Sequence, residues 1–138
     1  MAKLPEEVIE AIEDDQSIKM IATSDENGIA NLVPVGSFMV IDPETLAYAC
    51  FFSGKTKKNL ETTRNTTVAV YLPPYEGYQV KGKFVKWEKS GEIYEKVAGA
   101  AMEQLKNIGL SLKPQAVGIV KVTEAYVLSM PMAGDKIA

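Results

Sequence analysis

The sequence predicts a mainly β fold, a small six-stranded antiparallel barrel with helices at its periphery. Segments rich in apolar and β-branched residues recur along the chain, and most are joined by short turns. Two such turns are residues 25–28 (Asp-Glu-Asn-Gly) and residues 42–45 (Asp-Pro-Glu-Thr). Tight turns join antiparallel strands, whereas parallel strands need long crossovers. Closing the sheet removes its edges, and a helix can cover any gap that remains.

Three helices are expected. Residues 5–14 form the first, because Pro5 suits a first helical turn and the apolar residues that follow recur at helical spacing. A short helix is expected at residues 55–63, directly after the third strand. A long helix is expected at residues 91–108, before the last strand, and Gly109 is a suitable residue to end it.

The six expected strands are rich in β-branched and aromatic residues and are bounded by Gly, Pro, Asn and Asp. The second strand is expected to be broken or bulged near Pro34 and Gly36, because proline cannot donate to a sheet and glycine often marks a bulge. We place the strands at residues 18–24, 29–41, 46–52, 66–72, 78–87 and 117–128.

The chain has 138 residues, 46% of them hydrophobic and 24% charged, so one globular domain is expected over residues 1–138. Its formal net charge of −3 argues against a general nucleic-acid-binding role. No apolar run reaches the roughly 18 residues of a membrane span, and no signal peptide is recognisable. The single cysteine, Cys50, is expected to be a buried, inert thiol, and its isolation fits a reducing, cytoplasmic setting.

Histidine is absent from the sequence. Its absence excludes Ser-His-Asp and Cys-His nucleophilic machinery, and also the zinc sites that contain histidine. One cysteine cannot build a zinc site from cysteines alone, so no metal site is expected. If the chain carries out redox or group-transfer chemistry, a bound cofactor is expected to supply the reactive group.

The most informative segment is residues 52–64, where a strand leads into the short helix. It carries four basic residues and one acidic residue in a chain whose net charge is −3. Backbone N–H groups at a helix start, supported by the helix dipole, bind anions. The hydroxyls of Ser53 and Thr56 and the ammonium of Lys55 add donors, and Asn59 adds an amide. Together these groups suit a terminal phosphate.

Two other interpretations of this segment follow from the residues alone. A basic run is often only a solvated helix face. Gly54-Lys55-Thr56 also resembles the end of a nucleotide-binding P-loop, but that motif needs glycine five residues before Gly54, where this chain has Ala49. The P-loop interpretation therefore fails, and the solvated face remains the alternative to a phosphate site.

The chain resembles a known family at this point. A helix-strand-turn-strand start is followed by a strand that leads into Ser-Gly-Lys-Thr-x-x-Asn-Leu at residues 53–60, and an apolar strand comes next. This order is similar to that of the pyridoxamine 5′-phosphate oxidase-like flavin proteins, and closest to their small FMN-binding members. The resemblance extends over roughly residues 18–122. It implies a six-stranded antiparallel split barrel that binds FMN.

The resemblance also implies a set of cofactor-binding residues. Lys55 and Thr56 match the positions that hold the FMN phosphate, and Asn59 matches a polar position one helical turn later. The bend in the second strand falls where the family lays backbone against the isoalloxazine ring, although a simple barrel bulge is the alternative. The expected cofactor-binding residues are therefore Val35, Gly36, Ser37, Ser53, Lys55, Thr56 and Asn59.

The family further implies a homodimer with a flavin in each groove between the subunits. One subunit would then place aromatic residues, or its Met-rich C-terminal tail, near the flavin ring of the other. The candidate aromatic residues are Tyr71, Tyr75, Tyr78 and Trp87. A deazaflavin is the alternative cofactor, because a basic phosphate site would serve either molecule.

Departures from the family pattern narrow the expected activity. The second strand lacks the basic motif of the full-length oxidases, and no histidine is present for their substrate cluster or for an axial haem ligand. Oxidation of pyridoxamine phosphate and haem binding are therefore not expected. We expect an FMN-dependent oxidoreductase that acts on an unknown small substrate or electron donor. The alternatives are a non-catalytic FMN carrier or electron-transfer protein, and a cofactor-free barrel whose basic segment meets an acidic partner.

Overall fold

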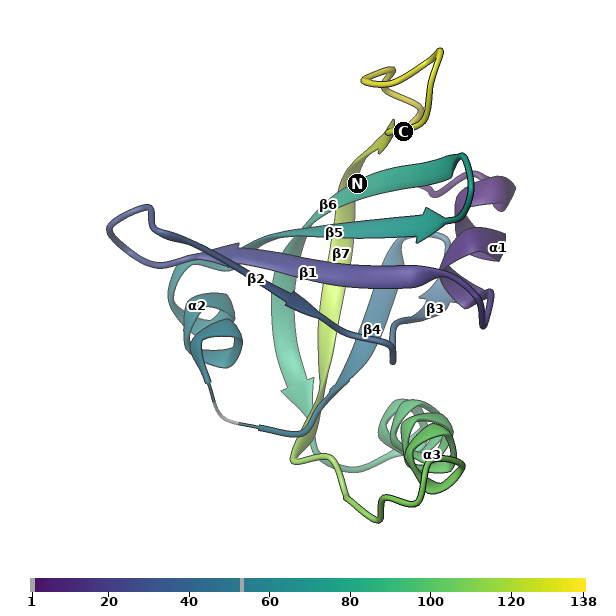
Figure 1. Ribbon diagram of the computed structural model, residues 1–138. Coiled ribbons are helices and arrows are strands. Elements are labelled where there is room, and N and C mark those ends of the chain that lie inside the picture. The colour runs from purple at the N-terminus through teal and green to yellow at the C-terminus, as the bar shows by residue number, and fades with distance from the viewer. Residues whose placement is uncertain (1, 53) are drawn as a thin grey trace.

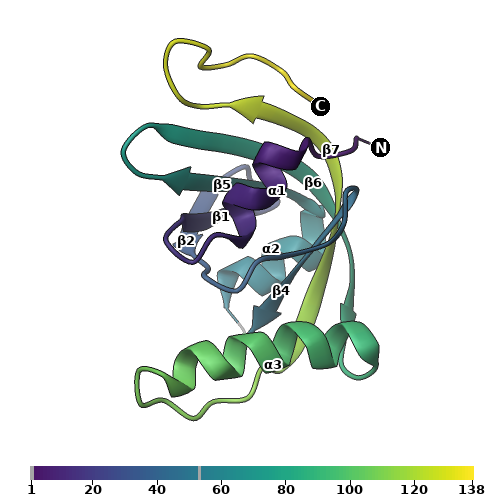
Figure 2. The same ribbon diagram turned by 90° about the vertical axis from the view of Figure 1, so that its right-hand side faces the viewer.

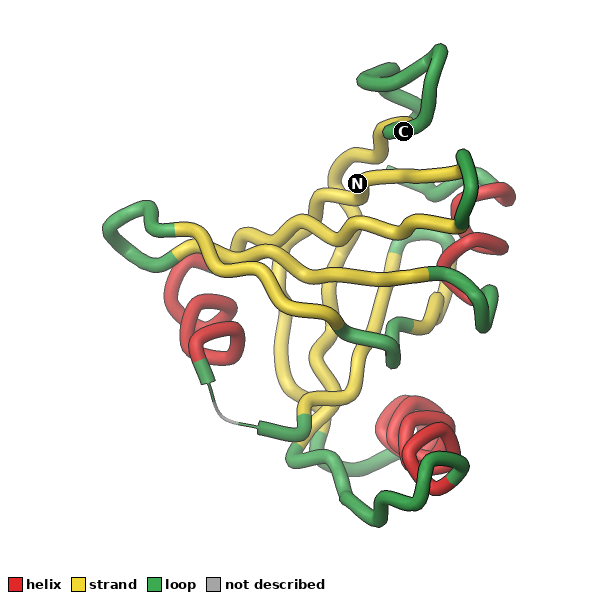
Figure 3. The backbone as a smooth tube through the Cα atoms, in the orientation of Figure 1, coloured by secondary structure: helices red, strands yellow, loops and turns green. Residues whose placement is uncertain are grey.

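The computed structural model describes residues 2–52 and 54–138. Figure 1 shows a strongly curved sheet with one helix on each of three sides, and Figure 3 shows how short most of the connections are. The helices are α1 (Glu6–Glu13), α2 (Lys55–Thr63) and α3 (Glu92–Lys106). The strands are β1 (Ile18–Ser24), β2 (Ala30–Pro34), β3 (Met39–Asp42), β4 (Thr45–Cys50), β5 (Asn65–Leu72), β6 (Glu76–Glu88) and β7 (Ala116–Val127).

The described residues form one antiparallel sheet of seven strands, in the order β2-β1-β5-β6-β7-β4-β3. The mainly β, antiparallel prediction is confirmed, but the strand count of six and the closed sheet are wrong. The expected strand at residues 29–41 is two strands, β2 and β3, at opposite ends of the sheet. Pro34 is the last residue of β2, an edge strand, where a proline without an N–H is tolerated, and residues 35–38 turn the chain away.

The three helices were correctly predicted, with small differences at their ends. α3 ends at Lys106 rather than at residue 108, and Gly109 adopts a φ of +83° in the turn that follows. The face of α3 that packs on the sheet carries Tyr94 and smaller residues, and Ala98 and Ala101 are buried with Ala47 and Ala49 of β4. These small side chains allow the helix to lie close to β4.

The main core fills the inside of the curved sheet. α1 closes one end of it, and Figure 2 shows this helix lying across the strands, with α3 below them. Across the described residues the largest fully buried side chains are aliphatic and come from all three helices and the long strands: Ile12, Ile21, Leu46, Leu60, Val8, Val68, Val70, Val80, Val97, Val117, Val120 and Val122.

A glycine on β7 makes room for two aromatic rings in this core. A Cβ atom at Gly118 would lie 2.8 Å from Cε1 of Tyr48 and 2.9 Å from Cζ3 of Trp87. The rings of Tyr48 and Trp87 meet edge to face with centroids 6.1 Å apart, and Phe38 packs on Tyr48 at 5.3 Å. Gly118 therefore lets the aromatic residues pack directly on the sheet.

The two ends of the described chain lie beside β7. Ala2 donates its N–H to the carbonyl of Val122, and Ala138 accepts from the N–H of Ala125. Residues 128–135 project from the sheet as a hook before the chain returns (Figure 1). Within the described part of the chain, no helix combines the length and the apolar character needed to cross a membrane.

Candidate functional site

A cleft of about 650 Å³ lies where the sheet is split, between β2 and the free end of β4. β3 pairs only with the first residues of β4, so the last residues of β4 face the split. The start of α2 forms one side of the cleft, and α3 forms another. The lining residues are Asn31, Val33, Pro34, Val35, Gly36, Ser37, Tyr48, Ala49, Cys50, Phe51, Phe52, Gly54, Lys55, Thr56, Lys57, Ala101, Gln104 and Leu105.

Most of the residues predicted to bind a cofactor meet in this cleft. The structure brings together Val35, Gly36, Ser37, Lys55 and Thr56. Ser53 lies outside the described residues. Asn59 does not line the cleft: it is buried, and its amide donates a 3.0 Å hydrogen bond to the hydroxyl of Thr23. In this chain Asn59 therefore fixes α2 against β1.

The start of α2 presents hydrogen-bond donors and positive charge to the cleft. Gly54 is the N-cap residue, and the first intrahelical bond runs from the N–H of Lys58 to the carbonyl of Gly54. The preceding N–H groups of the first turn have no acceptor within the helix. The first turn contains no acidic residue, and Lys55 is exposed. An anion at this end of the cleft would meet backbone donors and a lysine together.

The opposite wall is the bend after β2. The N–H of Val35 donates to the carbonyl of Lys19 at 2.9 Å, so β1 already uses this group. The hydroxyl of Ser37 accepts from the N–H of Ala49 at 3.0 Å and lies 3.4 Å from the carbonyl of the same residue. Ser37 thereby joins the two sides of the split. A Cβ atom at Gly36 would meet nothing within 4 Å, so the space beside this residue is open.

Tyr48 and Cys50 lie two residues apart on one face of β4 and line the cleft. Cys50 is buried, as predicted, and its thiol donates to the carbonyl of Phe52 at 3.3 Å. Burial raises the pKa of Cys50, so the thiol stays protonated at neutral pH. Burial, with the Cys50 thiol beside it, also raises the pKa of Tyr48 well above its usual range. Both groups are uncharged at neutral pH.

A charged network supports the cleft from behind α2. Lys57 lines the cleft and forms a 2.9 Å ion pair with Glu61. Glu61 also accepts a 2.8 Å hydrogen bond from the indole Nε1 of Trp87, and the Lys57 ammonium lies 5.5 Å from the centre of that ring. The hydrogen bond from Lys57, and next the one from Trp87, lower the pKa of Glu61. Trp87 therefore packs on α2 and on Tyr48 of the same chain.

Several lining residues were missed by the sequence analysis. Ala101, Gln104 and Leu105 of α3 reach the cleft only through the packing of that helix, and no local pattern marks them. Tyr48 was also missed, although a tyrosine within an otherwise apolar strand was a visible signal. Phe52 is 73% exposed at the cleft, which is unusual for an apolar side chain of its size.

The lining fits a phosphorylated flat ring. One end offers backbone N–H groups and Lys55, while the walls are largely apolar, with Val33, Val35 and Phe51 among them. Ligand sites commonly combine apolar walls with a few polar groups that fix orientation. Tyr48 also lines the cleft, and its buried hydroxyl has no hydrogen-bond partner among the described residues.

Comparison with known proteins agrees with this arrangement. The sequence profile of the family described as pyridoxamine 5′-phosphate oxidase matches residues 4–129. An uncharacterised protein of Methanocaldococcus jannaschii is 33% identical over 141 residues, which cover 100% of this chain and 90% of that protein.

Solved structures share the fold. HupZ of group A Streptococcus superposes with a TM-score of 0.78 and 24% identity, covering 98% of this chain and 100% of that one. An FMN-binding protein from Syntrophomonas wolfei gives a TM-score of 0.76 and 19% identity, covering 88% of this chain and 84% of that one. A protein named F420 reductase superposes with a TM-score of 0.65 and 15% identity, covering 88% of this chain and 98% of that one.

The family match extends beyond residues 18–122, over which the sequence resemblance was recognised, and includes α1 and the end of β7. The resemblance is therefore confirmed, and the split between β2 and β4 gives the observed sheet the open form that it implied. This chain belongs to the pyridoxamine 5′-phosphate oxidase family.

Proposed function

We propose that this chain binds a flavin in the cleft. The phosphate is placed at the start of α2, and the ring lies between residues 35–37 and the free end of β4. One observation carries the proposal: the split in the sheet joins a cationic helix start to a largely apolar slot with open space beside Gly36. FMN meets both requirements, with a terminal phosphate and a flat ring. A deazaflavin is the alternative, because it offers the same two features.

A bound flavin would supply the electron chemistry, and the residues of this chain would bind and orient it. Lys55 and the first turn of α2 hold the anionic end. The Ser37 hydroxyl holds the two sides of the cleft together through Ala49. Together these contacts fix the ring relative to β4. We propose on this basis that the protein is an oxidoreductase acting on a small substrate or electron donor.

A homodimer with the flavin between subunits is part of the proposal. One apolar side chain at the cleft supports it, since Phe52 lines the cleft and is 73% exposed. A large apolar side chain exposed at the mouth of a site is typical of a surface that another protein covers. A second subunit over this rim would bury Phe52 and exclude water from the cleft.

A non-catalytic FMN-binding or electron-transfer protein is the second candidate. Among the described lining residues there is no carboxylate, and the thiol of Cys50 and the hydroxyl of Tyr48 stay protonated at neutral pH because burial raises their pKa values. The described part of the cleft thus contains no general base. Electron transfer needs none, so this composition favours a carrier or relay as the alternative.

The first test is the visible absorption spectrum of the purified protein, before and after addition of FMN and removal of the excess. Retained FMN shows two bands, and a deazaflavin shows one band at shorter wavelength. Lys55→Ala should weaken FMN binding about ten-fold or more, because a charge-assisted contact to phosphate is lost. The matched control is Lys58→Ala, which removes an exposed lysine of the same helix that does not line the cleft.

Three outcomes are distinct. Binding that is lost in Lys55→Ala and kept in Lys58→Ala supports the site. Equal loss in both variants shows that general charge attraction, not the cleft, holds the phosphate. A folded protein that retains neither chromophore contradicts the proposal and favours a cofactor-free interaction barrel.

A further inference from the structure

The hydroxyl of Tyr48 is an exception among the buried polar groups of this protein. Tyr48 is 3% exposed, and its oxygen is the one buried side-chain polar atom without a hydrogen-bond partner in the described part of the chain. Other buried polar side chains are paired: Thr66 donates to the carbonyl of Ala22 at 2.8 Å, and Thr45 accepts from Lys121 at 2.7 Å. Native proteins rarely leave such a group unpaired without a reason.

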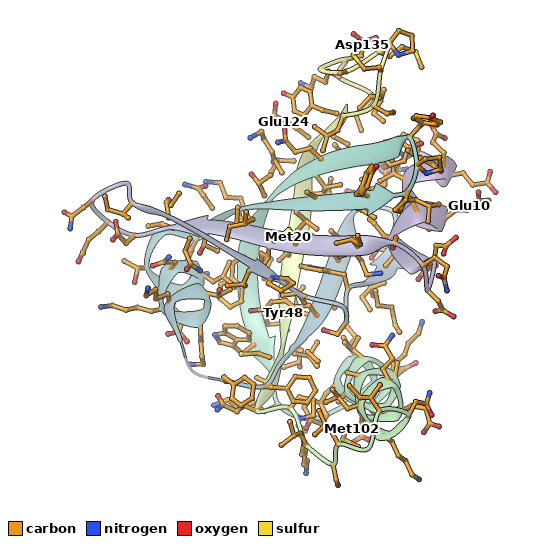
Figure 4. The ribbon with its side chains drawn as sticks, viewed as in Figure 1. Glu10, Met20, Tyr48, Met102, Glu124 and Asp135 are labelled. Carbon is orange, nitrogen blue, oxygen red and sulfur yellow. The ribbon has the colours of Figure 1, made fainter. Side chains whose placement is uncertain are left out.

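The ring of Tyr48 is held on several sides. Phe38 packs on it at 5.3 Å and Trp87 at 6.1 Å, while the missing side chain of Gly118 lets it lie against β7. Figure 4 shows Tyr48 in the interior of the molecule, at the level of α2. Because the surrounding rings fix its position, the hydroxyl cannot readily turn toward solvent to find a partner.

The position of Tyr48 at the cleft offers a reason for its unpaired hydroxyl. Tyr48 lines the cleft together with its neighbours on β4, Ala49 and Cys50. The Cys50 thiol lies beside the hydroxyl and donates to the carbonyl of Phe52. Its sulfur is only a weak acceptor, and no hydrogen bond of normal geometry joins it to the Tyr48 hydroxyl. A tyrosine hydroxyl that stays protonated at neutral pH is a hydrogen-bond donor. What the Tyr48 hydroxyl lacks is therefore a strong acceptor, and a molecule in the cleft would be a source of one.

We propose that the Tyr48 hydroxyl recognises the bound ring by donating a hydrogen bond to a carbonyl oxygen or imine nitrogen on it. This inference rests on the proposed function, because it assumes that a heteroaromatic ring occupies the cleft. The phosphate has its own donors at the start of α2, so the acceptor for Tyr48 belongs to the ring system. The hydroxyl is a positioning and specificity group, since it sets how deep the ring enters and which edge faces β4.

The test compares Tyr48→Phe with a matched control, Tyr94→Phe. Tyr94 is also buried, at 6% exposure, but its hydroxyl donates to the carbonyl of Pro114 at 3.0 Å and it does not line the cleft. Without flavin, Tyr48→Phe should unfold at an equal or higher urea concentration than the wild type, because it removes an unpaired buried hydroxyl. Tyr94→Phe should unfold earlier, because it removes a paired one.

In ligand binding, Tyr48→Phe should be the impaired variant and Tyr94→Phe the unaffected one. Tyr48→Phe should bind both FMN and riboflavin on the order of ten-fold more weakly, and Tyr94→Phe should bind them like the wild type. Riboflavin lacks the phosphate, so an equal loss for both ligands places the acceptor on the part they share. A loss confined to FMN would overturn the assignment to the ring.

The remaining outcomes separate this inference from the proposed function. If Tyr48→Phe without flavin unfolds as early as Tyr94→Phe, the hydroxyl is paired within the protein and the inference is overturned. If the wild type binds FMN and Tyr48→Phe binds it equally well, the inference fails while the proposed function stands. If the folded wild type binds neither FMN nor a deazaflavin, the proposed function fails, and this inference fails with it.

Discussion

The side-chain amide of Asn31 donates to the hydroxyl of Thr56 at 3.1 Å, across 25 positions of sequence. Asn31 lies on the edge strand β2, and Thr56 lies in the first turn of α2. The bond ties the edge of the sheet to the helix start at this corner of the cleft. It also uses a lone pair of the hydroxyl and leaves the proton of Thr56 free to point at a bound oxygen.

Thr56→Val should therefore weaken the binding of FMN about three- to ten-fold, because one hydrogen bond to the phosphate is lost. Riboflavin, which has no phosphate, should bind as it does to the wild type. Thr62→Val is the matched control, since the hydroxyl of Thr62 donates to the carbonyl of Lys58 on the exposed side of the same helix. Fluorescence titration with both ligands measures the effect. An equal loss for riboflavin would show that Thr56 does not contact the phosphate.

Gly36→Ala is expected to leave stability within about 0.5 kcal/mol of the wild type while it weakens flavin binding. The fold tolerates the methyl group because a Cβ atom at this position would meet nothing within 4 Å. The proposed ring occupies that open space, so the methyl group would hold it away from the backbone. Urea denaturation and FMN titration of the same preparation separate the two effects. Unchanged affinity would mean that the ring lies elsewhere in the cleft.

Asn59 and Thr23 form a buried polar pair that is expected to matter for stability rather than for binding. Asn59→Ala should lower the free energy of unfolding by about 1–3 kcal/mol, because a buried partner is left unpaired. The double variant Asn59→Leu/Thr23→Val replaces both partners and should recover much of that loss. Urea denaturation measures both. Flavin affinity in the double variant should equal that of the wild type. Weaker flavin binding would instead show that Asn59 contacts the cofactor.

The link between Glu61 and Trp87 is expected to respond to acid. Hydrogen bonds from Lys57 and Trp87 lower the pKa of Glu61 in the folded chain, so their stabilising effect is complete above the unfolded value, about 4.3. It is lost as the pH falls through the lower folded value. Trp87 is the single tryptophan, so its fluorescence should change in this acidic range. Glu61→Gln should remove that transition, and an unaltered titration in the variant would refute the assignment.

Gly118→Ala should lower the free energy of unfolding by about 1–3 kcal/mol. The added methyl group would lie 2.8 Å from the ring of Tyr48 and 2.9 Å from that of Trp87, so both rings would have to shift. Gly99→Ala is a control of opposite sign, because Gly99 is exposed on α3 and a Cβ atom there meets nothing within 4 Å. It should stabilise the helix by about 0.5–1 kcal/mol. The urea midpoints of the two variants measure the expected loss and gain of stability.

The short-range features of this protein follow from its sequence. Apolar periodicity located α1 and α3, and Pro34 correctly marked the end of a strand. The run of basic residues around Lys55 predicted an anion site at the start of α2, whereas residues 35–37 were assigned to the same site by the family resemblance. These features depend on neighbours within a few positions, where proline, glycine and charge act directly on the local backbone.

The tertiary structure decided what depends on distant contacts. The break after Pro34 could have produced a bulge within one strand; packing instead sent β2 and β3 to opposite ends of the sheet and opened the cleft between them. Asn59 has the residue type of a ligand contact, but the rotation of α2 on β1 turned it toward Thr23. The unpaired state of the Tyr48 hydroxyl depends on Phe38, Trp87 and Gly118, which lie far from it in sequence. Burial and pairing are properties of the assembled core, so the chain alone could not reveal them.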